Sequence, residues 1–311
     1  MKLLFFIVNT KAGNGKALKL WERMKVELEQ QKINYRSFYT KYPTHAEELA
    51  RQIGSMFDDK IEAVIAVGGD GTIHEVVNGM VDYPQVKVGY IPAGSGNDFS
   101  RGFSVPKAPF DALRFIVKNR HRKGRLFDIG KTRVRGVTKS KYFVSSLGTG
   151  FDAAVSKLTN ESKMKKYLNK IKLGSLAYVG AVFRVLFTYK LTDVTIEIDN
   201  QTIHYNKVWF VTVSNQPYYG GGMKIAPKAS PRDGLFDVTI VHNLSRIKLL
   251  LVFLTVFLGK HTGFKEIVQH KGAKISIQSN TKMLVHADGE LVGQLPVQAE
   301  VQHQKISFLV K

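Results

Sequence analysis

The feature that most constrains the fold is a continuously apolar segment that ends in a glycine-rich turn. Residues 63–67 (AVIAV) are all apolar, and GGDGT follows at 68–72. An uninterrupted apolar run is typical of a strand that is covered on both faces of a parallel sheet. The spacing of Thr72 and Glu75 predicts a capping box at the start of a helix. The segment therefore predicts one strand–turn–helix unit of an α/β domain.

The turn itself predicts an anion site. Its three glycines leave backbone N–H groups unobstructed at a helix N-terminus, where proteins commonly bind phosphate. Asp70, in the middle of the turn, would repel a phosphate unless a cation lay between them, so the residues indicate phosphate together with Mg²⁺. The alternative is a tight turn in which Asp70 merely stands at the start of the helix.

Strands and helices alternate through the first part of the chain. We expect strands at 3–8, 34–39 and 86–91, a helix from about Lys16, and a second helix that begins with the capping box Thr44–Glu47. This alternation is the signature of βαβ units and predicts a doubly wound parallel sheet. In such sheets, ligands bind beyond the carboxyl ends of the strands.

Two further loops follow strands of this sheet. NTKAG (9–13) follows the first strand and matches neither the Walker A nor the GxGxxG pattern. PAGSGND (92–98) follows the strand at 86–91 and brings a second aspartate, Asp98, to the end of a strand. Because Asp70 and Asp98 follow successive strands, we expect their carboxylates to share one site.

The pattern changes beyond the basic stretch KNRHRKGR (118–125). Short alternating strands predict an antiparallel sandwich or barrel, with helical insertions at about 151–187 and 246–259. We therefore predict two domains, an α/β domain at 1–124 and a β-rich domain at 125–311. The C-terminal tail of the second domain is able to pack back on the first.

The composition limits the kinds of partner and the kinds of site that the protein can have. The chain has 46 Lys and Arg against 25 Asp and Glu, a net charge of +21. This excess implies an anionic partner such as nucleic acid, an acidic membrane surface or a phosphorylated substrate. The absence of cysteine excludes disulfides, thiolate nucleophiles and zinc–thiolate sites. The most apolar later run, 249–258, is about half as long as a membrane span, so it predicts a helix that is buried or lies at an interface.

Four motifs stand in the same order as in a known family. They are NTKAG, GGDGT, PAGSGND and a late ADGE at 287–290. Together they resemble the bacterial diacylglycerol kinase and lipid kinase family, whose catalytic fold is shared with sphingosine kinases and, more distantly, with NAD kinases. Thr10 departs from the family's usual proline, at a position that shapes a loop. The resemblance implies an ATP-dependent lipid kinase, with diacylglycerol as the leading acceptor and phosphatidic acid as the product.

The resemblance also assigns residues to ATP and Mg²⁺. It implies that ATP lies among residues of the strand ends and glycine turns, namely Asn9, Thr10, Lys11, Ala12, Gly13, Thr40, Gly69, Asp70, Gly71, Thr72 and Ser95. A network of aspartates and water would hold the catalytic Mg²⁺, namely Asp70, Asp98 and Asp128. Taken without the resemblance, Asp128 in LFDIG is more simply a member of a surface ion pair.

The late motif has two compatible interpretations. Asp288-Gly289 predicts a two-residue hairpin turn. The resemblance implies that this turn also delivers the general base, so that Asp288 or Glu290 takes the proton of the acceptor hydroxyl and the other orients it. Asp288 is the favoured base, and Asp70 completes the catalytic set.

A similar choice applies to SPRDGLFD at 230–237. Its Asp-Gly pair predicts another turn. The resemblance instead implies a second, structural Mg²⁺ that is held by Ser230, Asp233 and the carbonyl group of Leu235. Hard cations favour such oxygen ligands.

Residues 163–172 (KMKKYLNKIK) place apolar and basic side chains at helical spacing. The pattern predicts a basic amphipathic helix that lies on an anionic bilayer. The alternative is an ordinary surface helix with solvated lysines. With the resemblance, we expect a cytoplasmic protein that associates peripherally with the inner face of the membrane, acts on a lipid in an anionic surface and forms a homodimer.

Three functions remain open at this stage. A lipid kinase accounts for the glycine loops, the aspartates and the charge. An NAD kinase-like enzyme, or another kinase with a soluble substrate, accounts for GGDGT but gives the basic segment no role. A nucleic-acid-binding or regulatory module would explain the charge, but aspartates at strand ends would repel a phosphate backbone, and no aromatic-rich binding motif is present.

Overall fold

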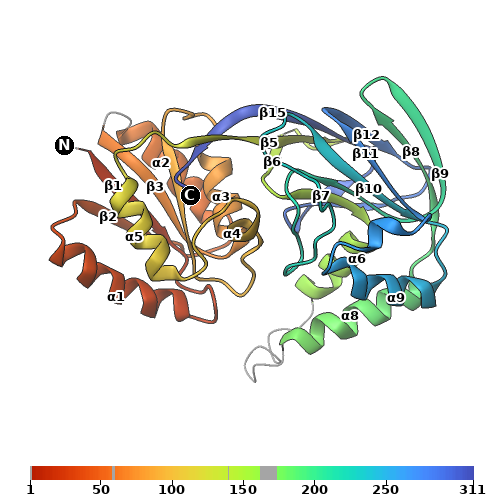
Figure 1. The fold of residues 1–311 in the computed structure, drawn as a ribbon, viewed down its shortest axis with the longest axis horizontal. Coiled ribbons are helices and arrows are strands. Elements are labelled where there is room, and N and C mark those ends of the chain that lie inside the picture. The colour runs from red at the N-terminus through yellow and green to blue at the C-terminus, as the bar shows by residue number, and fades with distance from the viewer. Residues whose placement is uncertain (1, 58–59, 139, 162–173) are drawn as a thin grey trace.

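The computed structural model describes residues 2–57, 60–138, 140–161 and 174–311. Two domains lie side by side, an N-terminal α/β domain and a C-terminal domain built mainly of antiparallel strands (Figure 1). Two long strands, β5 (Arg125–Val134) and β15 (Val297–Phe308), cross from one domain to the other. The predicted two-domain fold class is therefore confirmed.

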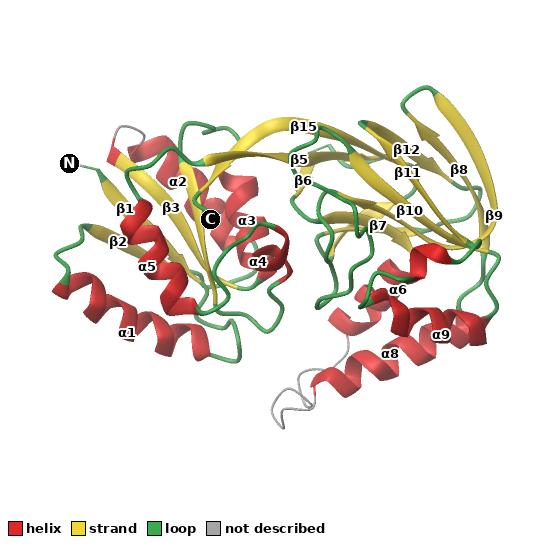
Figure 2. Ribbon diagram, in the orientation of Figure 1, coloured by secondary structure: helices red, strands yellow, loops and turns green. Residues whose placement is uncertain are grey.

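A parallel sheet forms the centre of the N-terminal domain. Its strand order is β2 (Tyr35–Tyr39), β1 (Leu3–Val8), β3 (Ile61–Gly68) and β4 (Lys87–Pro92). The helices on its two faces are α1 (Lys16–Gln30) with α5 (Pro109–Asn119), and α2 (His45–Phe57) with α3 (Asp70–Met80) (Figure 2). Because helices cover both faces, β1 and β3 are almost wholly buried, which explains their continuous apolar sequences.

The C-terminal domain packs helices against one side of an antiparallel sheet (Figure 2). Its other strands are β6 (Lys141–Phe143), β7 (Ser146–Gly150), β8 (Thr192–Ile198), β9 (Gln201–Ser214), β10 (Phe236–His242), β11 (Ile267–Gly272), β12 (Lys274–Gln278), β13 (Leu284–Ala287) and β14 (Glu290–Gln294). Its helices are α6 (Phe151–Glu161), α8 (Gly174–Thr188) and α9 (Arg246–Val256). One apolar core lies among the strands and a second lies beneath the helices, around Trp209 and Val252.

The C-terminal strand joins the two domains. β15 pairs antiparallel with β12 and β5, and then its residues Ser307 and Phe308 pair in parallel with Lys87 and Val88 of β4. Phe308 and Leu309 are buried in the core of the N-terminal domain. The tail of the chain thus extends the sheet of the first domain.

Both predicted capping boxes are wrong. Helix α3 begins at Asp70, so Thr72 lies within its first turn and is not its cap. Glu75 reaches out of this helix and accepts hydrogen bonds from the backbone N–H groups of Thr44 (3.0 Å) and Ala46 (2.9 Å) at the start of α2. The local patterns could not reveal this arrangement, because the capping carboxylate comes from a neighbouring helix.

The apolar run at 249–258 forms most of α9. One side of this helix is buried and the other is exposed, as expected for a helix at an interface. The basic segment at 163–172 lies outside the described residues. Among the helices that the structure describes, none combines the length and the apolar character needed to cross a bilayer.

Candidate active site

A cavity of about 560 Å³ opens where the strands of the N-terminal sheet end. Every residue assigned to ATP lines this cavity except Thr10. Sequence reasoning missed the lining residues Lys41, Tyr42 and Pro43. Their position directly after the predicted strand at 34–39 was the available signal, since the other lining loops also follow strands.

Close backbone contacts hold two glycine turns together at this cavity. The N–H group of Ala93 donates to the carbonyl oxygen of Gly68 at 2.7 Å. A Cβ atom on Gly94 would lie only 2.4 Å from the Cα atom of Gly69. Any side chain at position 94 would therefore force the two turns apart.

Asp70 lies where this cavity meets a second one of about 220 Å³. Its Oδ2 and Oδ1 atoms accept hydrogen bonds from the backbone N–H groups of Asp98 (3.0 Å) and Phe99 (3.1 Å). Burial raises the pKa of Asp70 to about 6, and the charges of Asp98 and Asp288 add to the rise, although the two N–H donors oppose it. The site therefore has an excess of negative charge at Asp70.

Asp98 lines the same second cavity, so the structure brings these two aspartates together. Arg101 pairs with its Oδ1 atom, and the N–H group of Gly221 donates to its Oδ2 atom at 2.7 Å. Gly221 has a φ of +89°, a conformation that glycine adopts without strain. The loop YYGGGM (218–223) of the C-terminal domain thus contacts the segment that follows β4.

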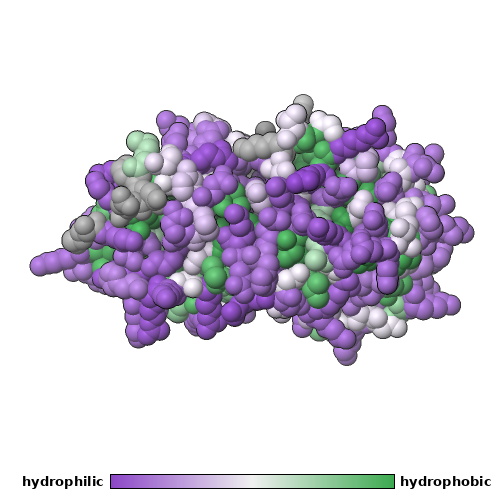
Figure 3. Space-filling model, turned by 90° about the horizontal axis from the view of Figure 1, so that it is seen from above, coloured by the Kyte–Doolittle hydropathy of each residue, from purple (hydrophilic) through white to green (hydrophobic). Residues whose placement is uncertain are grey.

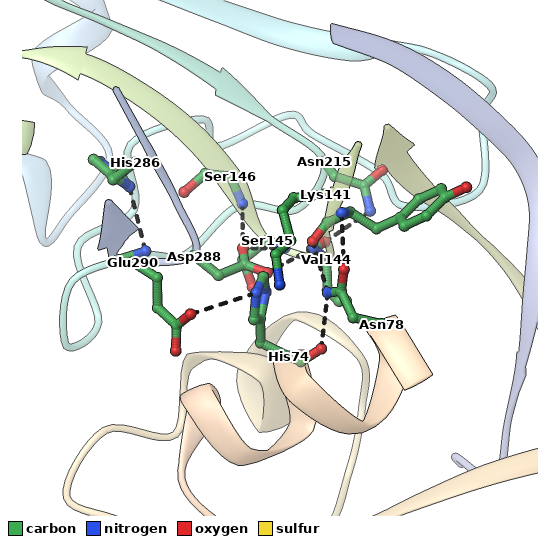
Figure 4. Close-up of polar contacts among 12 residues, drawn as sticks. His74, Asn78, Lys141, Val144, Ser145, Ser146, Asn215, His286, Asp288 and Glu290 are labelled. Atoms are coloured by element: carbon green, nitrogen blue, oxygen red, sulfur yellow. Dashed lines mark hydrogen bonds and ion pairs between the residues drawn. The ribbon is translucent and has the colours of Figure 1, made fainter. Parts of the chain in front are cut away.

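Asp288 comes from the C-terminal domain and forms the other wall of the second cavity (Figure 4). Asp288 and Gly289 have φ angles of +48° and +87° at the turn between β13 and β14, so the predicted hairpin is present. The Asp288 carboxylate accepts hydrogen bonds from the N–H groups of Val144, Ser145 and Ser146 at 2.7–2.9 Å. This network fixes the carboxylate in the cavity wall.

His74 provides the fourth contact of this carboxylate, at 2.8 Å from His74 Nδ1 to Asp288 Oδ2 (Figure 4). Burial alone would raise the pKa of Asp288, but the hydrogen bond and charge of His74, helped by the backbone donors, hold it below its usual value. In turn, Asp288 raises the pKa of His74 against the effect of burial. The pair therefore favours an ionised Asp288 beside a protonated His74.

Glu290 lies on the open side of this pair. Its side chain is 45% exposed, and its carboxylate is 4.0 Å from His74 Nε2 (Figure 4). The two acidic residues of the ADGE motif thus have different surroundings. Asp288 is buried and held by four donors, whereas Glu290 is solvated and interacts with the far side of the same imidazole ring.

A second histidine–aspartate pair lines the cavity next to Asp288. The N–H group of Gly289 donates to His286 Nδ1 (3.3 Å), so Nε2 carries the proton and donates to Asp152 Oδ2 (3.0 Å). Sequence reasoning missed His74, His286 and Asp152 as site residues. Only His286 had a local signal, because it precedes the ADGE aspartate by two positions in a predicted strand.

Asp128 lies apart from the two other aspartates of the predicted network. Its fully buried carboxylate accepts hydrogen bonds from the N–H groups of Gly234 (2.8 Å) and Gln304 (2.7 Å), and it pairs with His303 (2.9 Å). It does not line the cavity that the other two share. In this structure, Asp128 connects β5 to β15 and to the loop at 230–235.

At the loop at 230–235, where the resemblance implied a structural Mg²⁺, a lysine side chain lies beside the predicted ligand Asp233. Asp233 Oδ1 accepts a hydrogen bond from the N–H group of Leu235 (3.2 Å), and Asp233 Oδ2 lies 3.1 Å from Lys271 Nζ. The same ammonium group is 3.5 Å from Asp237. One ammonium group thus offsets only part of the negative charge of Asp233 and Asp237.

Asp70 fits a cation. Among the described residues, no group of three or more carboxylate and histidine side chains is arranged to hold a metal. Mg²⁺ needs fewer protein ligands, because water and substrate phosphates commonly complete its shell around one or two carboxylates. Burial is the main cause of the raised pKa of Asp70, with a further contribution from the charges of Asp98 and Asp288, and a divalent cation beside this carboxylate would favour its ionised form.

The cavities form a series. The first and second share Asp70, and the second shares Asp152 and Tyr219 with a third cavity of about 70 Å³. The third lies beneath α8 and α9 and is lined almost entirely by apolar side chains such as Leu186 and Val252. Along the series, the lining changes from glycine turns at strand ends, through a set of aspartates and a histidine, to apolar side chains.

Fold and site together define a two-domain kinase, and comparison with known proteins gives the family. Residues 3–129 match the model of the diacylglycerol kinase catalytic domain, and residues 145–310 match that of the YegS C-terminal NAD kinase beta sandwich-like domain. The chain belongs to the diacylglycerol kinase and lipid kinase family. This membership implies ATP as the phosphoryl donor, and it selects the lipid kinase among the three functions that the sequence left open.

Individual relatives support this assignment. The chain is 38% identical over 293 residues to a protein of Bacillus subtilis (strain 168) named "Putative lipid kinase YtlR", covering 94% of each chain. It is 31% identical over 239 residues to the "Diacylglycerol kinase" of the same organism, covering 76% of this chain and 74% of that one. A crystal structure titled as a putative diacylglycerol kinase from Bacillus anthracis str. Sterne has the same fold, with a TM-score of 0.77 and 24% identity over 100% of this chain and 95% of that one.

Proposed function

We propose that the protein transfers the γ-phosphoryl group of ATP to the hydroxyl group of diacylglycerol and produces phosphatidic acid. The observation that carries this proposal is the series of cavities, in which Asp70 separates the nucleotide cavity from a small polar cavity, and Asp152 separates that cavity from an apolar one. An acceptor with a hydroxyl group at the end of an alkyl chain matches this order. NAD, which is polar along its length, does not.

The transfer makes and breaks one bond each at phosphorus. The acceptor oxygen attacks the γ-phosphorus atom, the bond to the β,γ-bridging oxygen breaks, and ADP leaves. Such transition states need positioning and charge neutralisation more than covalent help from the protein. The glycine turns that line the nucleotide cavity would position the phosphates through their N–H groups.

Asp288 is the proposed acceptor of the hydroxyl proton. It lines the polar cavity with Asp70 and Asp98, and its low pKa keeps it ionised at neutral pH, as a general base must be. Its four hydrogen bonds make it a weak base, which suits a late proton transfer in a loose transition state. His74 positions Asp288 and keeps it charged, and Glu290 acts on the pair through the far side of the imidazole ring.

Asp70 is the proposed protein ligand of a catalytic Mg²⁺, with Asp98 beside it. When bound there, this cation would neutralise charge on the transferring phosphates. Asp70 is held in place for this role by its two backbone donors.

The reaction is tested by incubating the protein with γ-labelled ATP, Mg²⁺ and diacylglycerol in mixed micelles and identifying the labelled lipid. We expect labelled phosphatidic acid, and we expect the Asp70→Asn variant to lose much more than tenfold of the rate, equivalent to more than about 1.4 kcal/mol of transition-state stabilisation. NAD serves as the control acceptor. Labelling of NAD without labelling of the lipid would contradict the proposal, and labelling of another lipid from a total extract would change only the acceptor.

The proposed location is the cytoplasmic face of a membrane, where both ATP and the lipid are available. The net charge of +21 favours association with an anionic surface, since each Lys or Arg near such a surface adds about 1 kcal/mol. Fractionation of cells at low and high salt tests this location. A membrane-bound fraction that salt releases would support peripheral association.

A further inference from the structure

The outer face of α9 is apolar where a surface helix is normally polar. Ile247, Leu251 and Leu254 are 75%, 63% and 68% exposed, and Leu258, just beyond the helix, is 69% exposed. Their spacing of four, three and four residues places them in one stripe along the helix. The opposite side of α9 is buried and apolar, and the charged residues of the helix, Arg246 and Lys248, lie in its first turn.

Helix α8 extends the same apolar face. Phe183 and Phe187, one turn apart, are 46% and 64% exposed. The two helices are adjacent, because Arg246 at the start of α9 donates to the carbonyl oxygen of Leu186 in α8 (3.0 Å), and both run along the lower edge of the C-terminal domain in Figure 1. We call these six residues and the two helices that carry them the α8–α9 face.

The molecule does not expose apolar side chains in this way everywhere. Figure 3 shows the molecule from above, on the side away from these helices, and its surface is mainly hydrophilic with small, separated apolar areas. A contiguous apolar face on a protein surface marks a binding site for a protein or a membrane.

The segments that contain these helices carry basic residues and no acidic ones. The sequence has no acidic residue at 162–192 or at 238–265. Glu266 follows the second segment and pairs with Lys248 of α9 at 2.6 Å. Exposed cations accompany the apolar stripe, namely Arg184, Lys190 and Lys260. An apolar face flanked by basic side chains is complementary to the interface of an anionic bilayer, where apolar side chains enter the acyl region and cations remain at the headgroups.

The face also lies over the apolar cavity of the substrate series. Leu186, Leu250 and Phe253, on the same two helices, line that cavity. An alkyl chain that leaves a bilayer at this face would therefore pass between α8 and α9 into the cavity, and would have its polar end near Asp152. The position of the face is thus continuous with the proposed acceptor site.

We propose that the α8–α9 face is the surface by which the protein enters an anionic bilayer, with the stripe of α9 inserted among the acyl chains. This inference names the membrane partner of the proposed lipid kinase, and in that respect it rests on the proposed function. It concerns a surface other than the basic segment at 163–172.

Insertion is tested with a fluorophore on a single introduced cysteine, which is simple because the chain has none. Leu254→Cys carries an environment-sensitive dye on the α9 stripe, and Met56→Cys, 70% exposed on α2, carries it on the other domain as the matched control. On addition of phosphatidylglycerol vesicles, we expect a blue shift of the dye at position 254 and none at position 56. Equal spectra at both positions, or a shift only at position 56, would overturn the proposal.

Binding is measured separately with glutamine variants. Leu251→Gln with Leu254→Gln removes two exposed side chains of the stripe, and Val26→Gln with Met56→Gln removes two exposed side chains of the N-terminal domain. We expect the first variant to bind phosphatidylglycerol vesicles at least tenfold more weakly in co-sedimentation and the second to bind like wild type. Because all four positions are exposed, both variants are expected to fold, which circular dichroism checks. Unchanged vesicle binding by the first variant would overturn the proposal.

Two further outcomes separate the alternatives. Light scattering without lipid tests whether a second copy of the chain covers the face. If wild type is a dimer and the first glutamine variant is a monomer, the bilayer assignment is overturned, whereas an unaltered oligomeric state supports it.

Phosphorylation of a short-chain, water-soluble diacylglycerol tests the chemistry alone. If wild type does not phosphorylate this substrate, the proposed function is refuted, and the vesicle results still stand. If the first glutamine variant phosphorylates it at the wild-type rate, the α8–α9 face acts in docking and not in the chemistry.

Discussion

Asp70 is a carboxylate whose charge the folded protein disfavours, because it is buried beside Asp98 and Asp288. Its pKa of about 6 in the fold compares with roughly 4 in an unfolded chain. The folded state therefore binds this proton more tightly than the unfolded state. Above pH 6 the ionised carboxylate lowers the free energy of unfolding by its full amount, and below pH 4 it does not lower it at all. Stability therefore falls as pH rises through that range.

This cost predicts a pH-dependent difference between wild type and Asp70→Asn without metal. We expect the free energy of unfolding of the variant, minus that of wild type, to increase by about 1–3 kcal/mol between pH 4 and pH 6. The variant also loses one hydrogen bond to its amide group, but this loss is the same at every pH and does not contribute to the change between pH 4 and pH 6. Urea unfolding at several pH values measures it, and Asp111→Asn, an exposed site on α5, is the control. A difference that does not change with pH would show that the Asp70 pKa is ordinary.

The Asp288–His74 pair predicts two different kinetic effects. Asp288→Asn should lose about 10²- to 10⁴-fold in turnover while still binding ATP, the usual effect of removing a general base. His74→Asn should retain a base, and an N–H donor to it, but remove the positive charge that helps to lower its pKa. We therefore expect the acidic limb of its pH–rate profile to move upward by about one unit.

Measurement of kcat from pH 3 to 8, at saturating Mg²⁺ and ATP, separates these roles, since a histidine with only a structural role would change the rate without moving the limb. Glu290→Gln is the companion variant. Near-normal turnover of both Asp288→Asn and Glu290→Gln would place the base elsewhere.

At the residue scale, the sequence revealed the carboxylates but not their partners. Asp70 and Asp98 were predictable as neighbours because both follow adjacent parallel strands. The contact of His74 with Asp288 spans 214 positions and two domains, and no local pattern encodes it. Asp128 was assigned by resemblance to the site of Asp70, whereas its buried carboxylate is bound to the N–H groups of Gly234 and Gln304.

At the scale of elements, the two glycine turns at the nucleotide cavity depend on their close approach. Gly94→Ala would place a methyl group 2.4 Å from the Cα atom of Gly69, which the backbone cannot accommodate without moving. We expect the KM for ATP to rise at least tenfold and the free energy of unfolding to fall by about 1–3 kcal/mol. Gly263→Ala is the matched control, because a Cβ there meets no atom within 4 Å. Equal effects of the two substitutions would disprove the role of this contact.

The strands β10 and β11 offer a test of metal dependence. Lys271 on β11 lies between Asp233 and Asp237, where the resemblance implied a structural Mg²⁺. In the Asp70→Asn background, which removes the proposed catalytic Mg²⁺ site, we expect the melting temperature to be the same with EDTA and with Mg²⁺. In that background, Lys271→Met should lose about 1–2 kcal/mol, because it leaves two carboxylates without their cation, and added Mg²⁺ should restore part of this loss. A melting temperature of the Asp70→Asn variant that falls in EDTA would instead support the metal site at this loop.

Elements with a strong pattern were predictable, and not all of their ends were. The apolar run at 63–67 and the alternation of strands and helices around it predicted the parallel sheet, since burial on both faces of a strand determines its composition. The predicted start of α2 at Thr44 agrees with the structure, although Glu75 and not Glu47 binds its first N–H groups, whereas α3 begins earlier than the predicted cap Thr72. A cap that crosses between helices leaves no trace in local spacing.

At the scale of the whole molecule, the order of the motifs predicted two domains, but not how firmly strands would join them. β5 and β15 belong to both sheets, and the side chain of Phe308 packs against Phe99, Phe103 and Phe127 in the N-terminal core. These are contacts between distant segments, so only the fold reveals them. They imply that the two domains are energetically coupled.

The two tryptophans allow this coupling to be measured. Trp21 lies in α1 and Trp209 in β9, so Trp21→Phe and Trp209→Phe each leave one fluorescent reporter, in the C-terminal and the N-terminal domain respectively. Because the strands are shared, we expect the two urea transitions to coincide.

Phe308→Ala removes a fully buried side chain from between the aromatic rings and should lower the free energy of unfolding by about 3–5 kcal/mol. In coupled domains this loss moves both transitions by the same amount, although the substitution is in the N-terminal core. Phe187→Ala, at an exposed phenylalanine, is the control and should move neither by more than about 0.5 kcal/mol. If Phe308→Ala shifted the Trp21 transition and left that of Trp209 in place, the domains would unfold independently and the shared strands would carry no coupling.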